Sequence, residues 1–258
     1  MVLPLRSASV LPSKERRATV HITHIQLVTV DVSASARFYR EVLELPVSES
    51  DDLATVQVGA TGIELIHGDH QNGADHLAFT IPSNQFAEGK DWLSSKTELL
   101  QRDGEDEFRG ESPWDSESVY FRGPDGILLE LITRQRLQNG SNTPFTSASL
   151  LCVSEVGLAV PDVDAAVKDA REKFGLDTFG GHSELFAAVG DDHGLLILAT
   201  KNRVWFPTSD ARAQGGPPSV VIADTQRDGI LTSATGWRIE SGGSTHVGPR
   251  PTPRRHPE

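Results

Sequence analysis

The chain contains the stretch His24-Ile-Gln-Leu-Val-Thr-Val-Asp31 and repeats its pattern in Glu155-Val-Gly-Leu-Ala-Val-Pro-Asp162. The two stretches can be aligned without a gap as far as Leu45 and Leu176, and residues beyond them keep the same offset. A register held over this length indicates an internal duplication, and such a repeat fixes the architecture before any motif is considered.

The duplication divides the chain into two predicted domains. Residues 20–135 form the first, and residues 150–241 form a second, more divergent copy. The segment 136–149 is rich in Asn, Ser and Thr and is predicted to be a linker. We expect disordered tails at 1–19 and 242–258.

Each domain is predicted to consist of βαβββ-like modules. In the first, residues 21–30 have the β-branched, apolar composition of a strand, and Asp31 can cap the helix that follows. The same plan recurs from Asp75, whereas the second domain has one clear module and only strand fragments after about residue 218. The sequence therefore predicts an α+β fold built from tandem paired modules.

A metal site is predicted from matched residues in the two modules of the first domain. Each has a histidine early in its opening strand and a glutamate in its closing strand, namely His24 with Glu64 and His76 with Glu130. If these modules pack about a pseudo-two-fold axis, the side chains converge, and imidazole with carboxylate suits Fe, Mn, Zn, Ni or Co. A lone histidine in a strand is more often structural than a ligand. Glu130 among leucines is costly to bury unless it is paired or metal-bound.

The composition excludes some partners. The chain has 258 residues and a formal net charge of −12, which does not attract nucleic acid or anionic lipid. No apolar run reaches the roughly 20 residues that a membrane helix needs. The single cysteine, Cys152, fits a reducing compartment, and we expect a cytoplasmic protein.

Four segments together resemble the vicinal-oxygen-chelate superfamily. They are His24 to Asp31, Phe38-Tyr-Arg-Glu-Val-Leu43, Asp75-His-Leu-Ala-Phe79 and Tyr120-Phe-Arg-Gly-Pro-Asp-Gly-Ile-Leu-Leu-Glu130. That superfamily includes glyoxalase I, extradiol dioxygenases, fosfomycin-resistance transferases and bleomycin-binding proteins. The resemblance is strong over about 20–135 and weaker over 150–200. It implies that the paired βαβββ modules form curved mixed sheets around a metal cleft.

This resemblance implies roles for five residues. His24, His76 and Glu130 would bind the metal, and Tyr120 would act as an acid or hydrogen-bond donor to substrate. Glu64 matches a fourth ligand or base of the glyoxalase I pattern, but the stretch before it is short, so we expect Glu130 to matter more for metal binding.

The second domain departs from the pattern. Glu155 stands where His24 stands, and Leu195 or Leu196 stands where Glu64 stands. We therefore expect this domain to hold no metal and to serve as a structural partner.

The resemblance implies a metal-dependent enzyme that acts on a small molecule with adjacent oxygens. The two-histidine, one-carboxylate set with Tyr120 favours an extradiol dioxygenase-like activity. A glyoxalase I-like lyase or isomerase, and a non-catalytic binding protein of the bleomycin-binding type, remain the alternatives. The sequence leaves open whether the protein forms a homodimer.

Overall fold

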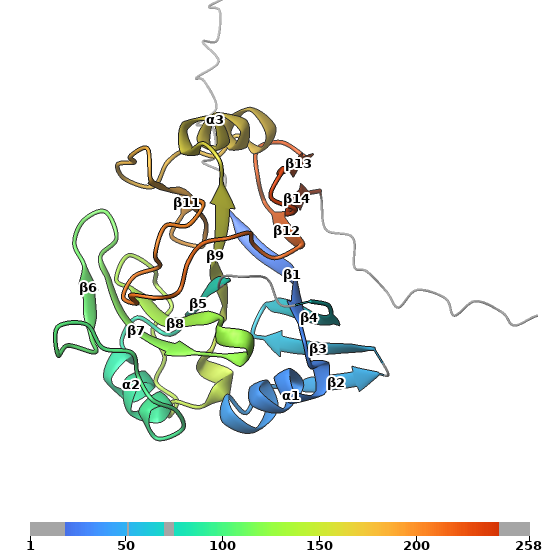
Figure 1. The fold of residues 1–258 in the computed structure, drawn as a ribbon. Coiled ribbons are helices and arrows are strands. Elements are labelled where there is room, and N and C mark those ends of the chain that lie inside the picture. Colours follow the sequence, from blue (N-terminus) through green and yellow to red (C-terminus); the bar gives the residue numbers. More distant parts are fainter. Residues whose placement is uncertain (1–18, 51, 70–74, 243–258) are drawn as a thin grey trace, which may run out of the picture.

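The computed structural model describes residues 19–50, 52–69 and 75–242. Among these residues the strands form two seven-stranded mixed sheets with few helices (Figure 1). This arrangement confirms the predicted α+β class of paired modules in curved sheets. The predicted tails, apart from residues 19 and 242, lie outside the described residues.

The first sheet has the strand order β13-β14-β12-β1-β4-β3-β2. Its strands are β1 (His21–Thr29), β2 (Val47–Ser50), β3 (Leu53–Val58), β4 (Thr61–His67), β12 (Ser219–Ala223), β13 (Gly229–Thr232) and β14 (Arg238–Ser241).

The second sheet has the strand order β10-β11-β9-β5-β8-β7-β6. Its strands are β5 (His76–Thr80), β6 (Phe108–Gly110), β7 (Ser116–Arg122), β8 (Leu128–Arg134), β9 (Cys152–Val160), β10 (Phe186–Asp191) and β11 (Gly194–Thr200).

Each sheet joins one module of the first domain to one module of the second. Strand β1 pairs antiparallel with β12, and β5 pairs antiparallel with β9. We expected the two modules of the first domain to face each other across the cleft, but their strands belong to different sheets. The sequence repeat is aligned correctly, whereas the partner of each module comes from the other half of the chain.

The helices confirm the local predictions. The first module has α1 (Val32–Arg37), which continues into the π-helical turn η1 (Phe38–Val42), and the second has α2 (Phe86–Ser94). The third has α3 (Val163–Phe174). The remaining helical turns are η2 (Pro124–Gly126) and η3 (Ser147–Ser149).

The repeat extends to the helix caps. The Asp31 carboxylate accepts from the backbone N–H of Ala34 at 2.8 Å, and Asp162 accepts in the same way from Ala165 at 2.9 Å. Each cap satisfies an otherwise unpaired N–H at the start of its helix. No helix in the described part of the chain is long and apolar enough to cross a membrane.

Strand β8 is buried on both faces, and this decides the environment of Glu130. Leu129 and Leu131 belong to the main core between the sheets and helices, whereas Leu128 belongs to a second apolar cluster on the opposite face. Strand alternation places Glu130 on the same face as Leu128. Glu130 therefore points into the concave side of the second sheet, where it is 2% exposed.

Candidate metal centre

Three side chains that can bind a metal meet on the concave face of the second sheet. Glu130 on β8 and Glu155 on β9 both lie directly opposite Ala78 of β5, one on each side. Residues paired across neighbouring strands point to the same face, and His76, two residues before Ala78, shares that face. The small side chain of Ala78 leaves space between the two carboxylates.

The distances within this group suit a shared cation. The Nε2 atom of His76 lies 3.6 Å from Oε2 of Glu130 and 3.6 Å from Oε2 of Glu155. These separations are too long for good hydrogen bonds. Donors bound at about 2.0–2.2 Å to one ion are separated by roughly 3–3.6 Å. Among the described residues this trio alone forms such a group, with its donor atoms all within 4.8 Å.

Burial makes the group electrostatically costly without a cation. The exposed fractions of His76, Glu130 and Glu155 are 5%, 2% and 4%. Burial, followed by the charge of Glu155, raises the pKa of Glu130 from 4.5 to about 7. Burial lowers the pKa of His76, but its contact with Glu155 and the charges of both carboxylates outweigh this effect and raise it. A divalent ion would replace these protons.

Arg134 positions one of the carboxylates. Its guanidinium is fully buried, contacts Oε1 of Glu155 and donates to the Ser154 hydroxyl at 3.1 Å. Ser154 in turn accepts from Thr80 at 2.7 Å. The contact to Oε1 orients Glu155 so that its other oxygen, Oε2, faces His76. The Nδ1 atom of His76 is buried and has no well-formed hydrogen bond. A weaker interaction with the backbone of Leu128 contributes to the raised pKa of His76.

Tyr120, the predicted hydrogen-bond donor to substrate, lies beside this group of side chains. It is paired with Glu130 across β7 and β8, and its ring centroid is 6.4 Å from that of His76. Burial, followed by the charges of Glu130 and Glu155, raises the pKa of the Tyr120 hydroxyl well above its ordinary value. The phenol is therefore protonated at neutral pH, and a hydrogen-bonding interaction with the Glu130 side chain contributes to the rise in its pKa.

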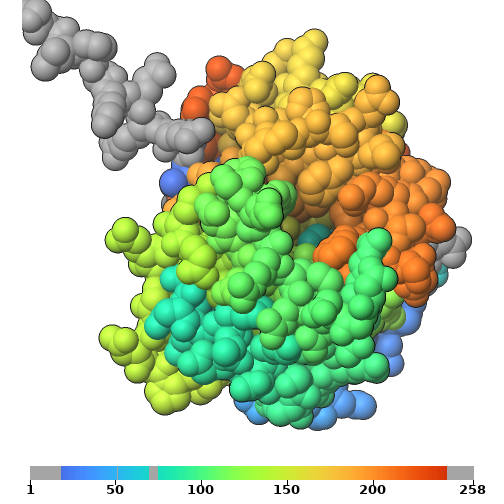
Figure 2. Space-filling view, turned by 90° about the vertical axis from the view of Figure 1, so that its left-hand side faces the viewer, coloured from blue at the N-terminus to red at the C-terminus, as the bar shows by residue number. Residues whose placement is uncertain are grey.

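The centre forms the floor of a cavity of about 590 Å³. Figure 2 shows the surface hollowed between the green segment that contains β6 and the orange segment that follows β11. The aromatic residues lining the cavity are Phe108, Trp114, Tyr120, Phe186, Trp205 and Phe206. A volume of this size and an aromatic wall suit a small organic molecule.

The structure places two of the predicted site residues elsewhere. His24 and Glu64 lie on β1 and β4 of the first sheet, whereas the other predicted ligands, His76 and Glu130, are on the second. The physical reason is the module pairing, because β5 has β9 beside it and not β1. The position expected for His24 is therefore filled by Glu155.

His24 and Glu64 belong to an equivalent set of positions, here called the sister site: His24, Gln26, Glu64 and Ser219. Gln26 occupies the place of Ala78, with Glu64 and Ser219 opposite it on either side. Its amide donates to the Glu64 carboxylate at 2.5 Å. A long side chain thus occupies the position that Ala78 leaves open, and the carboxylate of the second sheet is a serine here.

Glu155 is a candidate ligand that the sequence analysis did not assign, because the second domain was expected to hold no metal. The signal was present, because the repeat alignment puts Glu155 at the position of His24, and a glutamate can bind a metal as a histidine can. By strand register, the place of Glu130 in the third module is held by Ile197 on β11, not by Leu195 or Leu196. Three candidate protein ligands and one apolar position would leave room for an exogenous ligand on a bound ion.

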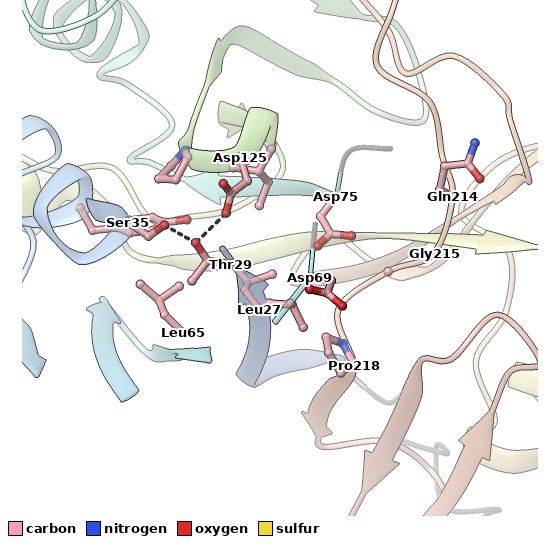
Figure 3. Close-up of a pocket in the computed structure, with 15 residues that line it drawn as sticks. Leu27, Thr29, Ser35, Leu65, Asp69, Asp75, Asp125, Gln214, Gly215 and Pro218 are labelled. Carbon is pink, nitrogen blue, oxygen red and sulfur yellow. Dashed lines mark hydrogen bonds between the residues drawn. The ribbon is translucent and has the colours of Figure 1, made fainter. Parts of the chain in front are cut away.

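A second, smaller cavity of about 60 Å³ lies at the end of β1, beside η2 (Figure 3). Three of its polar residues bond to one another: Asp125 accepts from the Thr29 hydroxyl at 2.6 Å, and Thr29 also bonds Ser35. Asp125 accepts from the Val30 N–H as well, at 3.1 Å. These contacts join a turn of the second module to a strand of the first. We interpret this cavity as a structural junction.

Comparison with known proteins shows the family to which the chain belongs. A model described as the Glyoxalase/Bleomycin resistance protein/Dioxygenase superfamily matches residues 21–131. A metallothiol transferase FosB of Staphylococcus haemolyticus (strain JCSC1435) is 30% identical over 121 residues, which cover 43% of this chain and 82% of that protein. The FosB of Staphylococcus saprophyticus is 29% identical over 119 residues, covering 43% and 76% of the two chains.

Two solved structures share the fold over most of the chain. The V278E mutant of glyoxalase I from Zea mays has a TM-score of 0.53 at 14% identity and covers 88% of this chain and 93% of its own. A putative dioxygenase from Bacillus subtilis has a TM-score of 0.54 at 16% identity and covers 88% and 86%. With the modules, the paired sheets and these matches in place, the chain belongs to the glyoxalase/bleomycin resistance/dioxygenase superfamily, also called the vicinal-oxygen-chelate superfamily.

Proposed function

We propose that this protein is a metal-dependent enzyme that binds one divalent ion on His76, Glu130 and Glu155 and acts on a small molecule with two adjacent oxygens. The observation that carries the proposal is the position of these three buried side chains at the floor of an aromatic cavity of about 590 Å³. The proposed ligand set replaces the predicted His24 with Glu155.

The donor set narrows the choice of metal. One imidazole and two carboxylates form an oxygen-rich site, which favours Mn(II) and Fe(II) among the predicted ions over softer ones. Such an ion acts as a Lewis acid towards bound oxygens and leaves coordination positions for them.

Among the reactions of this superfamily, the cavity favours ring-opening oxygenation of an aromatic diol. Its walls are aromatic, and Tyr120 beside Glu130 is placed to donate a hydrogen bond to a substrate oxygen. The glyoxalase-like alternative needs a further carboxylate as base. Glu64, the predicted candidate, lies on the other sheet, and Ile197 occupies the corresponding place here.

A second candidate is transfer of a thiol to a small electrophile. Its support is the 30% identity, over 121 residues, to a protein called a metallothiol transferase. The family model separately matches residues 21–131, which include His76 and Glu130. The third ligand, Glu155, lies beyond the matched residues 21–131. The comparison therefore supports a metal-dependent activity, but it does not identify the electrophile that would accept the thiol.

Metal analysis followed by two activity screens tests the proposal. Protein purified without chelator should hold about one divalent ion per chain, and His76→Ala should lose it while the matched variant His24→Ala keeps it. Oxygen uptake with catechols on Fe(II)-loaded protein should then exceed thiol consumption with epoxide substrates.

Three results would count against the proposal. Full metal content in His76→Ala would remove the proposed centre, and loss of metal in His24→Ala would restore the ligand set expected from the sequence. Stoichiometric metal without turnover in either screen would favour the binding-protein alternative.

A further inference from the structure

The arginines lining the large cavity differ in how their charge is balanced. Arg109 pairs with Glu117 at 3.2 Å, and Arg102 lies 3.8 Å from the carboxylate of Asp103. Arg203 is half-buried, and no carboxylate among the described residues lies within ion-pair distance of its guanidinium. It is thus the one cavity-lining arginine of the described chain with no acidic partner.

The surroundings of Arg203 are apolar. Its guanidinium carbon lies 4.8 Å from the ring centroid of Phe186, in cation–π contact. Burial lowers the pKa of Arg203, and no neighbouring acid offsets that effect. A partly desolvated guanidinium without a counter-ion is costly, and a bound anion would remove much of that cost.

The rest of the wall is suited to a flat ring. The ring of Phe206 meets those of Phe108 and Tyr120 edge to face, at centroid distances of 4.8 and 5.8 Å. The ring centroid of Trp205 lies 5.5 Å from that of His76, so Trp205 connects this aromatic wall to the proposed metal centre. Aromatic side chains pack against ligand rings in the same offset or edge-on geometries.

Acidic residues at the cavity do not prevent an anion from entering. Glu107 is paired with Lys90 at 2.7 Å, and Asp103 lies on the solvent side next to Arg102. Glu105 is exposed, so solvent and salt screen its charge. The carboxylates of the metal centre would be neutralised by the bound ion.

We infer that the substrate is an aromatic compound that carries a carboxylate in addition to its two adjacent oxygens, and that Arg203 binds this carboxylate. The inference rests on the proposed function, because the adjacent oxygens are assigned to the metal. It adds a specificity-determining residue and a substrate class: an aryl carboxylate and not a neutral aryl diol.

A pair of probes that differ only in the charged group tests the inference. 3,4-Dihydroxybenzoate and 4-methylcatechol share the ring and both hydroxyls, and calorimetry without oxygen would measure their affinities for Mn(II)-loaded and metal-free protein. Wild type should favour the carboxylate at least about tenfold, as expected for one charge-assisted hydrogen-bonded pair.

Variants identify the residue responsible. Arg203→Met should reduce the preference to about twofold or less, and Arg203→Lys should retain part of it, because the charge remains but the planar fork is lost. Arg102→Met removes an arginine from the same cavity that already has an acidic partner, and it should keep the preference. Circular dichroism and melting curves would establish that each variant is folded.

The outcomes separate this inference from the proposed function. Equal affinity for the two probes in wild type, no binding of either, or an unchanged preference in Arg203→Met would overturn the role of Arg203. If the chain binds no metal but metal-free protein still prefers the carboxylate through Arg203, the proposed metal chemistry fails while the anion site stands.

Discussion

Replacing Glu155 by glutamine is the sharpest test of the metal centre, because this residue separates the site seen in the structure from the one expected from the sequence. The substitution keeps the size of the side chain and an oxygen that can accept from Arg134, but it removes the negative charge. We expect metal affinity to fall at least about a hundredfold, or roughly 2.7 kcal/mol, since changes one shell further out already cost about 10–100-fold.

The structure supports an effect of this size. Oε2 of Glu155 is 3.6 Å from Nε2 of His76, and the residue is only 4% exposed, so water cannot readily take the place of the lost ligand. Its other oxygen meets the buried Arg134. Weakening a buried ion pair also lowers stability, by up to about 3–5 kcal/mol when one partner is lost altogether.

The control is the same substitution at the sister site. Glu64→Gln removes a carboxylate from a strand with the equivalent register, where it bonds Gln26 and not a proposed metal ligand. Affinity for Mn(II) and Zn(II), measured by competition with a chromogenic chelator, should be unchanged in Glu64→Gln and at least about a hundredfold weaker in Glu155→Gln. Wild-type affinity in a folded Glu155→Gln variant would refute the ligand assignment, and equal losses in both would refute the distinction between the two sheets.

Two further predictions follow from the same centre. Because the pKa of Glu130 is raised to about 7, the proton-bound site stabilises the metal-free protein at low pH, and this contribution is lost as pH rises through about 7. The metal-induced rise in melting temperature should therefore grow between about pH 5.5 and pH 8, and a shift that is constant over this range would contradict the coupling. Ala78→Gln should place an amide between the two carboxylates and reduce metal affinity at least about tenfold, or roughly 1.4 kcal/mol, whereas Ala78→Ser should retain binding; a chelator competition would contradict this if both variants bind equally.

The local fold could be predicted because its signals are local. The strand at His21–Thr29, the cap at Asp31 and their counterparts at Cys152–Val160 and Asp162 depend on neighbouring residues, and all were recognisable. Glu130 and Tyr120 were assigned correctly to one strand pair because the turn between their strands fixes the register.

The sequence did not predict which module pairs with which to form each sheet. Whether β5 lies beside β1 or β9 depends on how whole modules bury their sheet edges, and no short pattern records that choice. Assigning His24 to the centre assumed that modules adjacent in sequence are adjacent in space. Arg134 was missed for the same reason, since its importance appears only once Glu155 is beside it.

The equivalent faces of the two sheets differ in only a few side chains. The proposed metal centre can therefore be tested by building a copy of it in the first sheet. Register equates His24 with His76, Glu64 with Glu130, and Ser219 with Glu155, while Gln26 stands in place of Ala78. The double variant Gln26→Ala, Ser219→Glu should therefore create a second metal site in the first sheet.

That new site should be weaker than the natural one, because His24 and Glu64 are only half-buried and no arginine corresponding to Arg134 holds the introduced carboxylate. In a background that also carries Glu155→Gln, the double variant should recover about one ion per chain, and Gln26→Ala alone should not. Competition with a chromogenic chelator gives the affinity, and loss of the recovered ion on adding His24→Ala locates it. If the combined variant folds and binds no metal, register equivalence does not suffice to build the centre, and the buried contact between Arg134 and Glu155 must be counted as part of the metal site itself.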